Sequence, residues 1–369
     1  MEIHKHKTKK IMMLGNSYLS IYGLRSELIE CLIKNGYEIH TVFPNGPFGV
    51  GELKSKEMNC AFYNVHLKRR GKNIFQEIKL GVQYFYYIKK VRPDIILAYT
   101  VKPILYGGII SRIFSIPFLP NITGLGEALQ NSRFIRYFYK IAIKNAECIF
   151  FQNEKDQSFF ERNGFKYKQS RLLPGSGVNL EKICVLEYPE RTNVKFFYVA
   201  RVMKAKGIEE FLEAASKMKK LYKDVEFHIC GICEEEYIEK LKEYEKKDVI
   251  KYHGLVHDIQ NYYKKAHCIV MPSYYPEGMS NVLLEAAASG RPIITTNRVG
   301  CKEAVDDMVT GYLVKEKDSI DLFEKMRSFY ELSFNEKKSM GIKGRRKVEM
   351  EFDRNRVVKE YLEIINTIN

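Results

Sequence analysis

Two consecutive series of alternating strand and helix patterns constrain the fold of this chain more than any other feature. Residues 11–14 form a short apolar run, a helical pattern with one apolar face covers about 24–32, and residues 38–43 form a second apolar run before Pro44. Such a strand–helix–strand unit implies a parallel sheet covered by helices. The first series continues with a helix at about 75–90 and strands at 94–98, 117–122 and 148–151.

The second series begins after Pro174-Gly175-Ser176-Gly177. It predicts helices at 207–220 and 234–246 and strands at 195–199, 226–230, 249–252, 268–271, 292–295 and 311–314. We therefore expect an α/β protein with two doubly wound domains, 1–172 and 173–350, and a helix over 351–369 that packs back toward the first domain. Ligands of such sheets bind beyond the carboxyl ends of the strands, so functional motifs are sought there.

Charge is distributed unevenly along the chain. Residues 1–170 carry 26 Lys and Arg against 13 Asp and Glu, whereas residues 171–369 carry 34 against 32. The basic half indicates a polyanionic partner: nucleic acid, an anionic membrane or a phosphorylated lipid. The N-terminus does not resemble a signal peptide, and no apolar run approaches the ~18 residues that span a bilayer. A cytosolic protein whose eight cysteines are reduced is expected.

Residues 273–290 combine a tight loop, a helix start and two glutamates. Glu277 precedes the predicted helix and Glu285 lies about two turns into it, roughly 10 Å away along the axis at ~1.5 Å per residue. This separation is too large for two carboxylates that share one water, but it suits two contacts on one extended ligand. Free N–H groups at the helix start offer an anion site. The alternative is that both glutamates are simply solvated. Glu285, however, is flanked by apolar residues at 282–288, and a carboxylate in such surroundings needs a partner.

The order of these residues, continued by Gly290-Arg291-Pro292, closely resembles the signature of glycosyltransferase family 4. The match extends to Arg201 with Lys206-Gly207 and to the segments 174–179, 299–305 and 311–314, so it covers most of 171–315 in the family's order. The resemblance implies retaining transfer from a nucleotide-diphosphate sugar. It also implies the GT-B fold, in which two Rossmann-like domains face each other across a cleft.

The resemblance assigns roles to the matching residues. Arg201 and Lys206 are expected to contact the donor diphosphate, because fixed cations there stabilise the departing group. Glu277 is expected to contact the donor sugar. These three are the candidate catalytic residues. Glu285 is expected on the ribose. The other candidate donor-binding residues are Gly278, Met279, Ser280, Asn281 and Val282 at the helix start, Leu255 and Val256 at the base, and Gly15 and Asn16 in the first domain.

No covalent nucleophile is expected, because the favoured account of this family is same-face attack in which the donor phosphate takes the acceptor's proton. No cofactor and no metal are expected either, since the two cations can replace a divalent ion and no Asp-x-Asp lies at a predicted strand end. Cys230, Cys233, His253 and His257 superficially resemble a zinc set, but their gap of 19 residues exceeds the usual ~12–15.

The first domain holds the candidate acceptor-side residues Thr123, Glu127 and Lys102. Many family members have a His where this chain has Thr123, so no His-assisted role carries over. Segments 98–108 and 121–126, with Gly300-Cys301, resemble a bacterial subgroup that builds capsule, O-antigen and lipid-linked oligosaccharides. This similarity implies a UDP-sugar donor and a glycan or glycolipid acceptor such as a polyprenyl-diphosphate saccharide. The transferred sugar is expected to be a hexose or an N-acetylhexosamine, and a uronic acid is the alternative.

Two segments of the first domain, 68–90 and 133–140, mix basic and aromatic residues. They predict peripheral docking on the inner face of the plasma membrane rather than nucleic-acid binding; ordinary helices with core-facing aromatics are the alternative. Two other functions remain open. A UDP-sugar 2-epimerase or other enzyme on the same scaffold needs acid–base residues that the sequence does not reveal, and a polyanion-binding module would not need Arg201, Lys206, Glu277 and Glu285 in this order.

Overall fold

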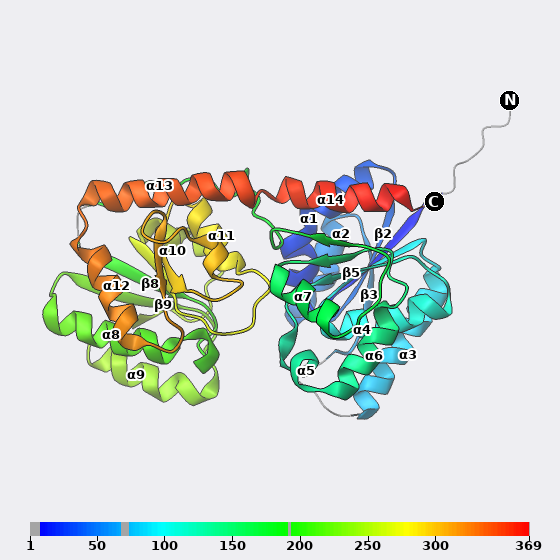
Figure 1. Cartoon of the computed structure of the whole chain (residues 1–369), viewed down its shortest axis with the longest axis horizontal. Coiled ribbons are helices and arrows are strands. Elements are labelled where there is room, and N and C mark those ends of the chain that lie inside the picture. The colour runs from blue at the N-terminus through cyan, green and yellow to red at the C-terminus, as the bar shows by residue number, and fades with distance from the viewer. Residues whose placement is uncertain (1–7, 68–73, 191–192, 369) are drawn as a thin grey trace. The chain divides into compact units, whose positions relative to one another are not determined.

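The structure, a computed structural model, describes residues 8–67, 74–190 and 193–368. The chain separates into two units, each built on its own parallel sheet (Figure 1). Unit 1 comprises residues 1–176 and 354–369, and unit 2 comprises residues 177–353. Unit 1 therefore contains the end of the chain as well as its beginning.

Seven parallel strands form the sheet of unit 1, in the order β3-β2-β1-β4-β5-β6-β7. The winding direction reverses between β1 and β4, which makes this the topological switch point of the sheet. Strand β4 is apolar and buried throughout, as is typical of parallel sheets covered by helices on both faces. The strands are β1 (Lys10–Leu14), β2 (Glu38–Phe43), β3 (Ala61–Asn64), β4 (Ile95–Tyr99), β5 (Phe118–Ile122), β6 (Ile149–Phe151) and β7 (Ser170–Leu172).

Helices cover the sheet of unit 1 in two layers. Helices α3, α4, α6 and α7 share one apolar core with one face of the strands, and α1, α2 and α14 lie over the other face. Side chains alternate between the two cores along the central strands; in β1, Met12 enters the first core and Met13 the second. The helices are α1 (Leu24–Lys34), α2 (Val50–Glu57), α3 (Ile74–Val91), α4 (Val101–Ile113), α5 (Gly126–Asn131), α6 (Arg133–Ile143), α7 (Glu154–Arg162) and α14 (Arg354–Thr367).

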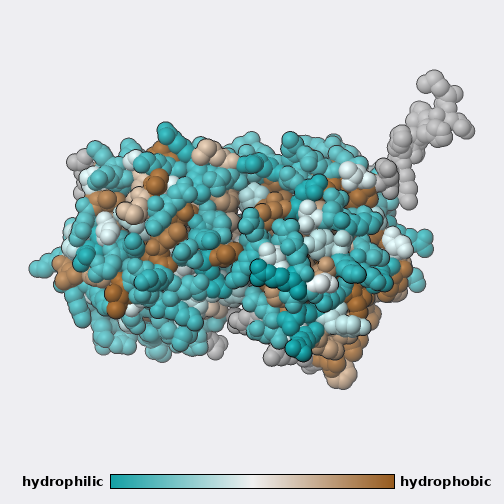
Figure 2. Space-filling model, in the orientation of Figure 1, coloured by the Kyte–Doolittle hydropathy of each residue, from teal (hydrophilic) through white to brown (hydrophobic). Residues whose placement is uncertain are grey.

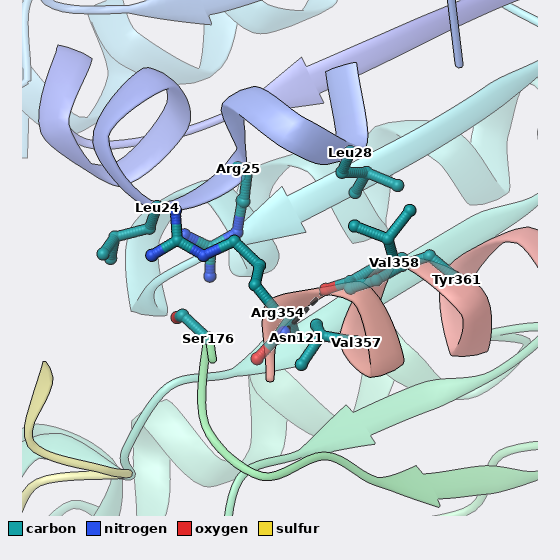
Figure 3. Close-up of a pocket in the computed structure, with 9 residues that line it drawn as sticks. All are labelled: Leu24, Arg25, Leu28, Asn121, Ser176, Arg354, Val357, Val358 and Tyr361. Carbon is teal, nitrogen blue, oxygen red and sulfur yellow. Dashed lines mark hydrogen bonds between the residues drawn. The ribbon is translucent and has the colours of Figure 1, made fainter. Parts of the chain in front are cut away.

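Polar contacts as well as apolar packing fix α14 within unit 1. Arg354 Nη1 donates to Glu27 Oε2 of α1 at 2.8 Å, and Asn121 Nδ2 at the end of β5 donates to Tyr361 Oη at 2.6 Å. Figure 3 shows Arg354, Asn121 and Tyr361 around a small cavity that Arg25 also lines. Buried polar groups of this kind need their partners, so they fix the register of α14 on α1.

Six parallel strands form the sheet of unit 2, in the order β10-β9-β8-β11-β12-β13, with its switch point between β8 and β11. The strands are β8 (Val194–Val199), β9 (Val225–Cys230), β10 (Lys251–Tyr252), β11 (Cys268–Met271), β12 (Ile293–Thr296) and β13 (Gly311–Val314). The helices are α8 (Ile208–Leu221), α9 (Ile238–Lys246), α10 (Ile259–Lys265), α11 (Asn281–Ala288), α12 (Ser319–Glu331) and α13 (Phe334–Glu351).

These two sheets confirm the predicted α/β class with two doubly wound domains. Three strands, β2, β11 and β13, have the predicted bounds, and most others differ by one residue at an end. The sequence did not reveal the outer strands β3 and β7, because both are short and no residue of either is fully buried. Among the described residues, no helix is both long and apolar enough to cross a membrane.

Candidate active site

The candidate catalytic residues lie on the two sides of the switch point of unit 2. Arg201 and Lys206 follow β8, and Glu277 follows the neighbouring strand β11. The two strands are parallel and paired, so the segments that leave them emerge at the same carboxyl edge. Residues that are far apart in sequence are thereby brought together where ligands of such sheets bind.

The loop that carries Glu277 is clamped between two other segments. On one side, Tyr274 N donates to Ala205 O at 2.9 Å; on the other, Ser280 N donates to Gly300 O at 2.8 Å. Gly300 has φ +92°, and a Cβ there would lie 2.6 Å from Glu277 O. A glycine is therefore required for this close approach, and the backbone of the loop is fixed before any ligand arrives.

Within this frame the Lys206 ammonium contacts the Glu277 carboxylate. Both side chains are largely buried, at 11% and 17% exposure. Tyr275 borders the pair: Lys206 Nζ lies 5.3 Å and Arg201 Cζ 5.8 Å from the centre of its ring. Tyr275 was not among the predicted site residues. Its position two residues before Glu277 in the same loop is the sequence feature that could have identified it.

Burial lowers the pKa of the Lys206 ammonium to about 8, and nearby Arg201 acts in the same direction. The Glu277 carboxylate opposes both effects because it favours the charged form of its partner. Arg201 is more exposed and lies 3.8 Å from Glu234. The site thus places two cations side by side, one buried and one accessible, and such an arrangement suits a diphosphate.

Helix α11 begins next to these cations. Its N-cap residue Ser280 makes no side-chain cap within the described structure, since its hydroxyl is directed at Met271 Sδ, 3.7 Å away. Asn281 Oδ1, at the first helical position, is buried and has no hydrogen-bond partner among the described residues. Gly278 and Met279 are buried beside it. A helix start without a side-chain cap and with an adjacent polar amide provides a place for an anionic, hydroxyl-rich ligand.

The remaining donor-side candidates surround this helix start. Val282 and Glu285 are half-buried on α11, and Glu285 lies next to Tyr263, whose pKa is raised by burial first and then by this carboxylate. Leu255 and Val256 follow β10, two strands from β8 in the sheet. Leu255 is exposed to solvent.

In unit 1 the candidates also follow the strands of a switch point. Gly15 and Asn16 come directly after β1, where Asn16 N donates to Ser20 Oγ at 3.2 Å, and a Cβ at Gly15 would lie 2.7 Å from that oxygen. Thr100, which follows β4, was not predicted. It has φ +71°, which is a strained conformation for a β-branched residue, and its buried hydroxyl has no partner in the described residues.

The acceptor-side candidates are dispersed along the carboxyl edge of the same sheet. Lys102 Nζ donates to Glu77 Oε1 of α3 at 2.5 Å, and Tyr106 Oη donates to the other oxygen at 2.8 Å. Thr123 lies in the turn after β5. Glu127 is in α5, but its side chain lies outside the described part of the chain.

The four residues of the zinc alternative do not form a site. His253 Nε2 lies 3.0 Å from His228 Nδ1, and burial lowers the pKa of His228 to about 4. Among the residues that the structure describes, no three His, Cys, Asp or Glu side chains are close enough together to hold a metal ion.

Known protein families match both units. The model "Glycosyl transferases group 1" matches residues 187–347, and "Glycosyl transferase 4-like" matches residues 10–153. The chain belongs to this glycosyltransferase family. Its enzyme class is therefore that of sugar transfer, as the residues around β8 and β11 suggested.

Relatives of this glycosyltransferase match it over almost its full length. It is 24% identical over 385 residues to N,N'-diacetylbacillosaminyl-diphospho-undecaprenol alpha-1,3-N-acetylgalactosaminyltransferase of Campylobacter jejuni, covering 97% of this chain and 99% of the relative. It is 27% identical over 382 residues to the capsular polysaccharide biosynthesis glycosyltransferase CapM of Staphylococcus aureus, covering 98% of each. The predicted similarity to capsule and lipid-linked glycan enzymes is confirmed.

A solved structure shares the fold of this glycosyltransferase. HepE of Anabaena in complex with UDP-glucose has a TM-score of 0.79 at 15% identity, covering 97% of this chain and 99% of that one. At this identity the likeness establishes the fold alone, and it confirms the predicted GT-B class.

Proposed function

We propose that this glycosyltransferase moves a hexose or an N-acetylhexosamine from a UDP-sugar to a polyprenyl-diphosphate-linked saccharide, with retention of the anomeric configuration. The observation that carries the proposal is the grouping of Arg201, Lys206 and Glu277 beside the start of α11. Two cations and a helix N-terminus suit a diphosphate, and a carboxylate accepts hydrogen bonds from sugar hydroxyls.

Each residue has a distinct part in the proposed transfer. Glu277 orients the sugar through its hydroxyls, and Glu285 holds the ribose further along α11. The bond from the sugar to the diphosphate breaks while the acceptor oxygen attacks the same face, and the acceptor proton passes to the departing phosphate. Lys206 and Arg201 stabilise the negative charge that develops on the diphosphate. Metal-independent transfer is therefore proposed.

The donor and acceptor classes are supported by the names of known proteins. HepE was solved with UDP-glucose, and the name of the Campylobacter relative contains both an undecaprenyl diphosphate and an N-acetylgalactosaminyl group. We extend these classes to this chain because the relatives align from end to end. The sugar itself is left open between hexose and N-acetylhexosamine.

A thermal-shift screen over nucleotide sugars tests donor binding. A ligand at 100 times its Kd stabilises its protein by about 2.7 kcal/mol, which corresponds to roughly 5–10 °C for a unit of this size. Lys206→Met should reduce the shift strongly, whereas Lys204→Met should preserve it; Lys204 lies in the same short turn but is exposed and near Glu209. If no nucleotide sugar shifts the wild-type protein, the proposal fails in favour of a polyanion-binding module.

Transfer is then measured with the selected donor and a synthetic prenyl-diphosphate saccharide, with and without EDTA. The anomeric configuration of the product is read by NMR. An inverted product would refute the retaining step, and loss of turnover in EDTA would refute metal independence. Conversion of the donor to its 2-epimer without transfer would instead establish the epimerase alternative.

A further inference from the structure

The outward face of the layer formed by α3, α4 and α6 in unit 1 is unusually apolar. Phe75 and Phe134 are 79% and 72% exposed, although aromatic side chains of this size are normally covered. Figure 2 shows hydrophobic side chains gathered at the lower right, where Figure 1 places α3 and α6. The exposed large apolar residues of these three helices are Ile74, Phe75, Ile78, Val82, Phe85, Tyr86, Ile113, Phe134 and Tyr137.

The most exposed of these side chains lie outside the buried face of their helices. On α3, Leu80, Tyr84 and Ile88 already supply the buried face that packs on the sheet. Phe75, Ile78 and Val82 recur at helical spacing on the opposite face, so they form a second apolar stripe that points away from the core. An apolar stripe that stays exposed to solvent indicates a surface that is covered by something else.

Positive charge accompanies the apolar residues. Helices α3, α4 and α6 contain eight Lys and Arg and one acid, Glu77, which is already paired with Lys102. By contrast, α1, α2 and α14 on the other face of the sheet contain seven basic and six acidic residues. Unit 1 as a whole has 30 Lys and Arg against 15 Asp and Glu, whereas unit 2 has 30 of each.

We propose that this surface, which we call the α3–α4–α6 face, docks unit 1 onto an anionic lipid bilayer. Apolar side chains enter the interface while the basic residues meet the lipid phosphates. A second copy of the chain fits poorly because a symmetric contact would oppose the cations of both copies. Nucleic acid would not require a continuous apolar stripe. The basic segment 68–72 lies outside the described residues, and the face is defined without it.

The position of the α3–α4–α6 face matches the use of a lipid-linked acceptor. Helices of such folds start at the carboxyl edge of the sheet. The ion pair between Glu77 in the first turn of α3 and Lys102 in the first turn of α4 fixes both starts there, and Phe75 lies in the same turn of α3 as Glu77. The exposed start of α3 therefore lies at the same edge of the sheet as the acceptor-side candidate Lys102. This link to the acceptor rests on the proposed function; the docking itself does not.

Vesicle flotation tests the docking directly. The wild-type protein should float with vesicles of phosphatidylglycerol and cardiolipin at low ionic strength, and much less with neutral phosphatidylcholine vesicles. Added salt should weaken its binding because exposed charges are screened. If the wild-type protein does not float with anionic vesicles at low salt, the proposal is refuted.

Matched variants locate the surface. The triple variant Phe75→Ser, Ile78→Ser, Phe134→Ser should bind anionic vesicles at least about tenfold more weakly, because buried apolar area sets interfacial affinity. The control Leu221→Ser, Ile320→Ser removes side chains that are 62% and 63% exposed in unit 2 and should bind as the wild type does. Unchanged binding by the triple variant, or equal loss in the control, would overturn the assignment.

Two more measurements distinguish lipid docking from unfolding and from self-association. Lys89→Glu with Arg133→Glu should reduce binding without a change in melting temperature, because both residues are exposed. Light scattering should give the same molecular mass for the wild-type protein and the triple variant. If the wild type is a dimer and the triple variant is a monomer, the face would instead be assigned to contact with a second copy. The triple variant should keep its thermal shift with the donor, so failure of docking and failure of the proposed function give different results.

Discussion

Replacement of Glu277 by Gln tests the candidate site most directly, because it removes one charge and almost no volume. The carboxylate contacts the buried Lys206 ammonium. Loss of one partner from a buried ion pair costs about 3–5 kcal/mol when the other charge stays buried. Lys206 can avoid this cost by releasing its proton.

The pKa of Lys206, which burial lowers to about 8, sets the expected loss of stability. Release of its proton at pH 7 costs about 1.4 kcal/mol, the equivalent of one pKa unit. The Glu277→Gln variant should therefore lose about 1–2 kcal/mol, less than the range for a buried charge that cannot neutralise. In thermal melting this is a decrease of roughly 3–6 °C for a unit of this size.

Turnover should decrease far more than stability. The variant loses the charged acceptor for the sugar hydroxyls, and a neutral Lys206 no longer stabilises the departing diphosphate. Together these losses should lower kcat by at least about 100-fold, or roughly 2.7 kcal/mol, at saturating donor. Glu226→Gln is the control, since Glu226 pairs with Lys251 at 2.7 Å in the same unit but away from the site, and it should leave kcat unchanged.

The assay combines single-turnover transfer with thermal melting of the same preparation. A Glu277→Gln variant that keeps kcat within about threefold of the wild type would refute the role of Glu277, since this is below about 1 kcal/mol in the barrier. The role of Glu277 would also be refuted if kcat decreased only in proportion to the fraction of the variant that is folded.

Four further predictions concern the loop, the lysine and the C-terminal helix. Gly300→Ala should lower the free energy of unfolding by more than the roughly 1–2 kcal/mol that a positive φ alone costs, and it should weaken donor binding in calorimetry. Gly36→Ala is the control: Gly36 has φ +83° and open space around it, so the variant should lose only the cost of the positive φ. Affinity for the donor nucleotide should fall as the pH rises through about 8, when Lys206 loses its proton, and Lys206→Met should abolish this dependence. Without ligand, the lowered pKa of Lys206 makes the folded protein more stable as the pH rises. Between pH 8 and 10.5 the unfolded chain holds a proton that the folded protein has lost, so the free energy of unfolding of the wild type should increase relative to that of Lys206→Met. Arg354→Ala should destabilise unit 1 by about 3 kcal/mol in melting, and added Glu27→Gln should restore part of it; no recovery would mean that their ion pair is not the source of the loss.

The sequence alone predicted most of the sheet strands because parallel strands are buried on both faces. Runs such as 38–43 and 268–271 are almost continuously buried, and burial of such runs leaves few other arrangements. The outer strands β3 and β7 were missed, since a half-exposed edge strand need not be apolar. The two alternating series also determined the α/β class, because each strand–helix–strand unit implies parallel pairing.

The spacing of residues in the candidate site was partly determined by the sequence. Glu277 and Glu285 were placed on one loop and helix, and their separation indicated two contacts on a single ligand. Arg291, which follows the same motif, is fully buried and donates to Tyr263 O at 2.7 Å and Glu187 O at 2.5 Å. Proximity in the motif therefore did not distinguish a structural residue from candidate ligand contacts.

Only the tertiary structure decided which distant residues meet. The contact of Lys206 with Glu277, and the position of Tyr275 beside both cations, depend on the pairing of β8 with β11, which no local pattern specifies. The strain at Thr100 likewise depends on its backbone conformation at the switch point. The aromatic residues of α3 and α6 were visible in the sequence as mixed with basic ones, but their exposure was not. Helical periodicity gives two faces, and only the packing on the sheet decides which of them reaches the solvent.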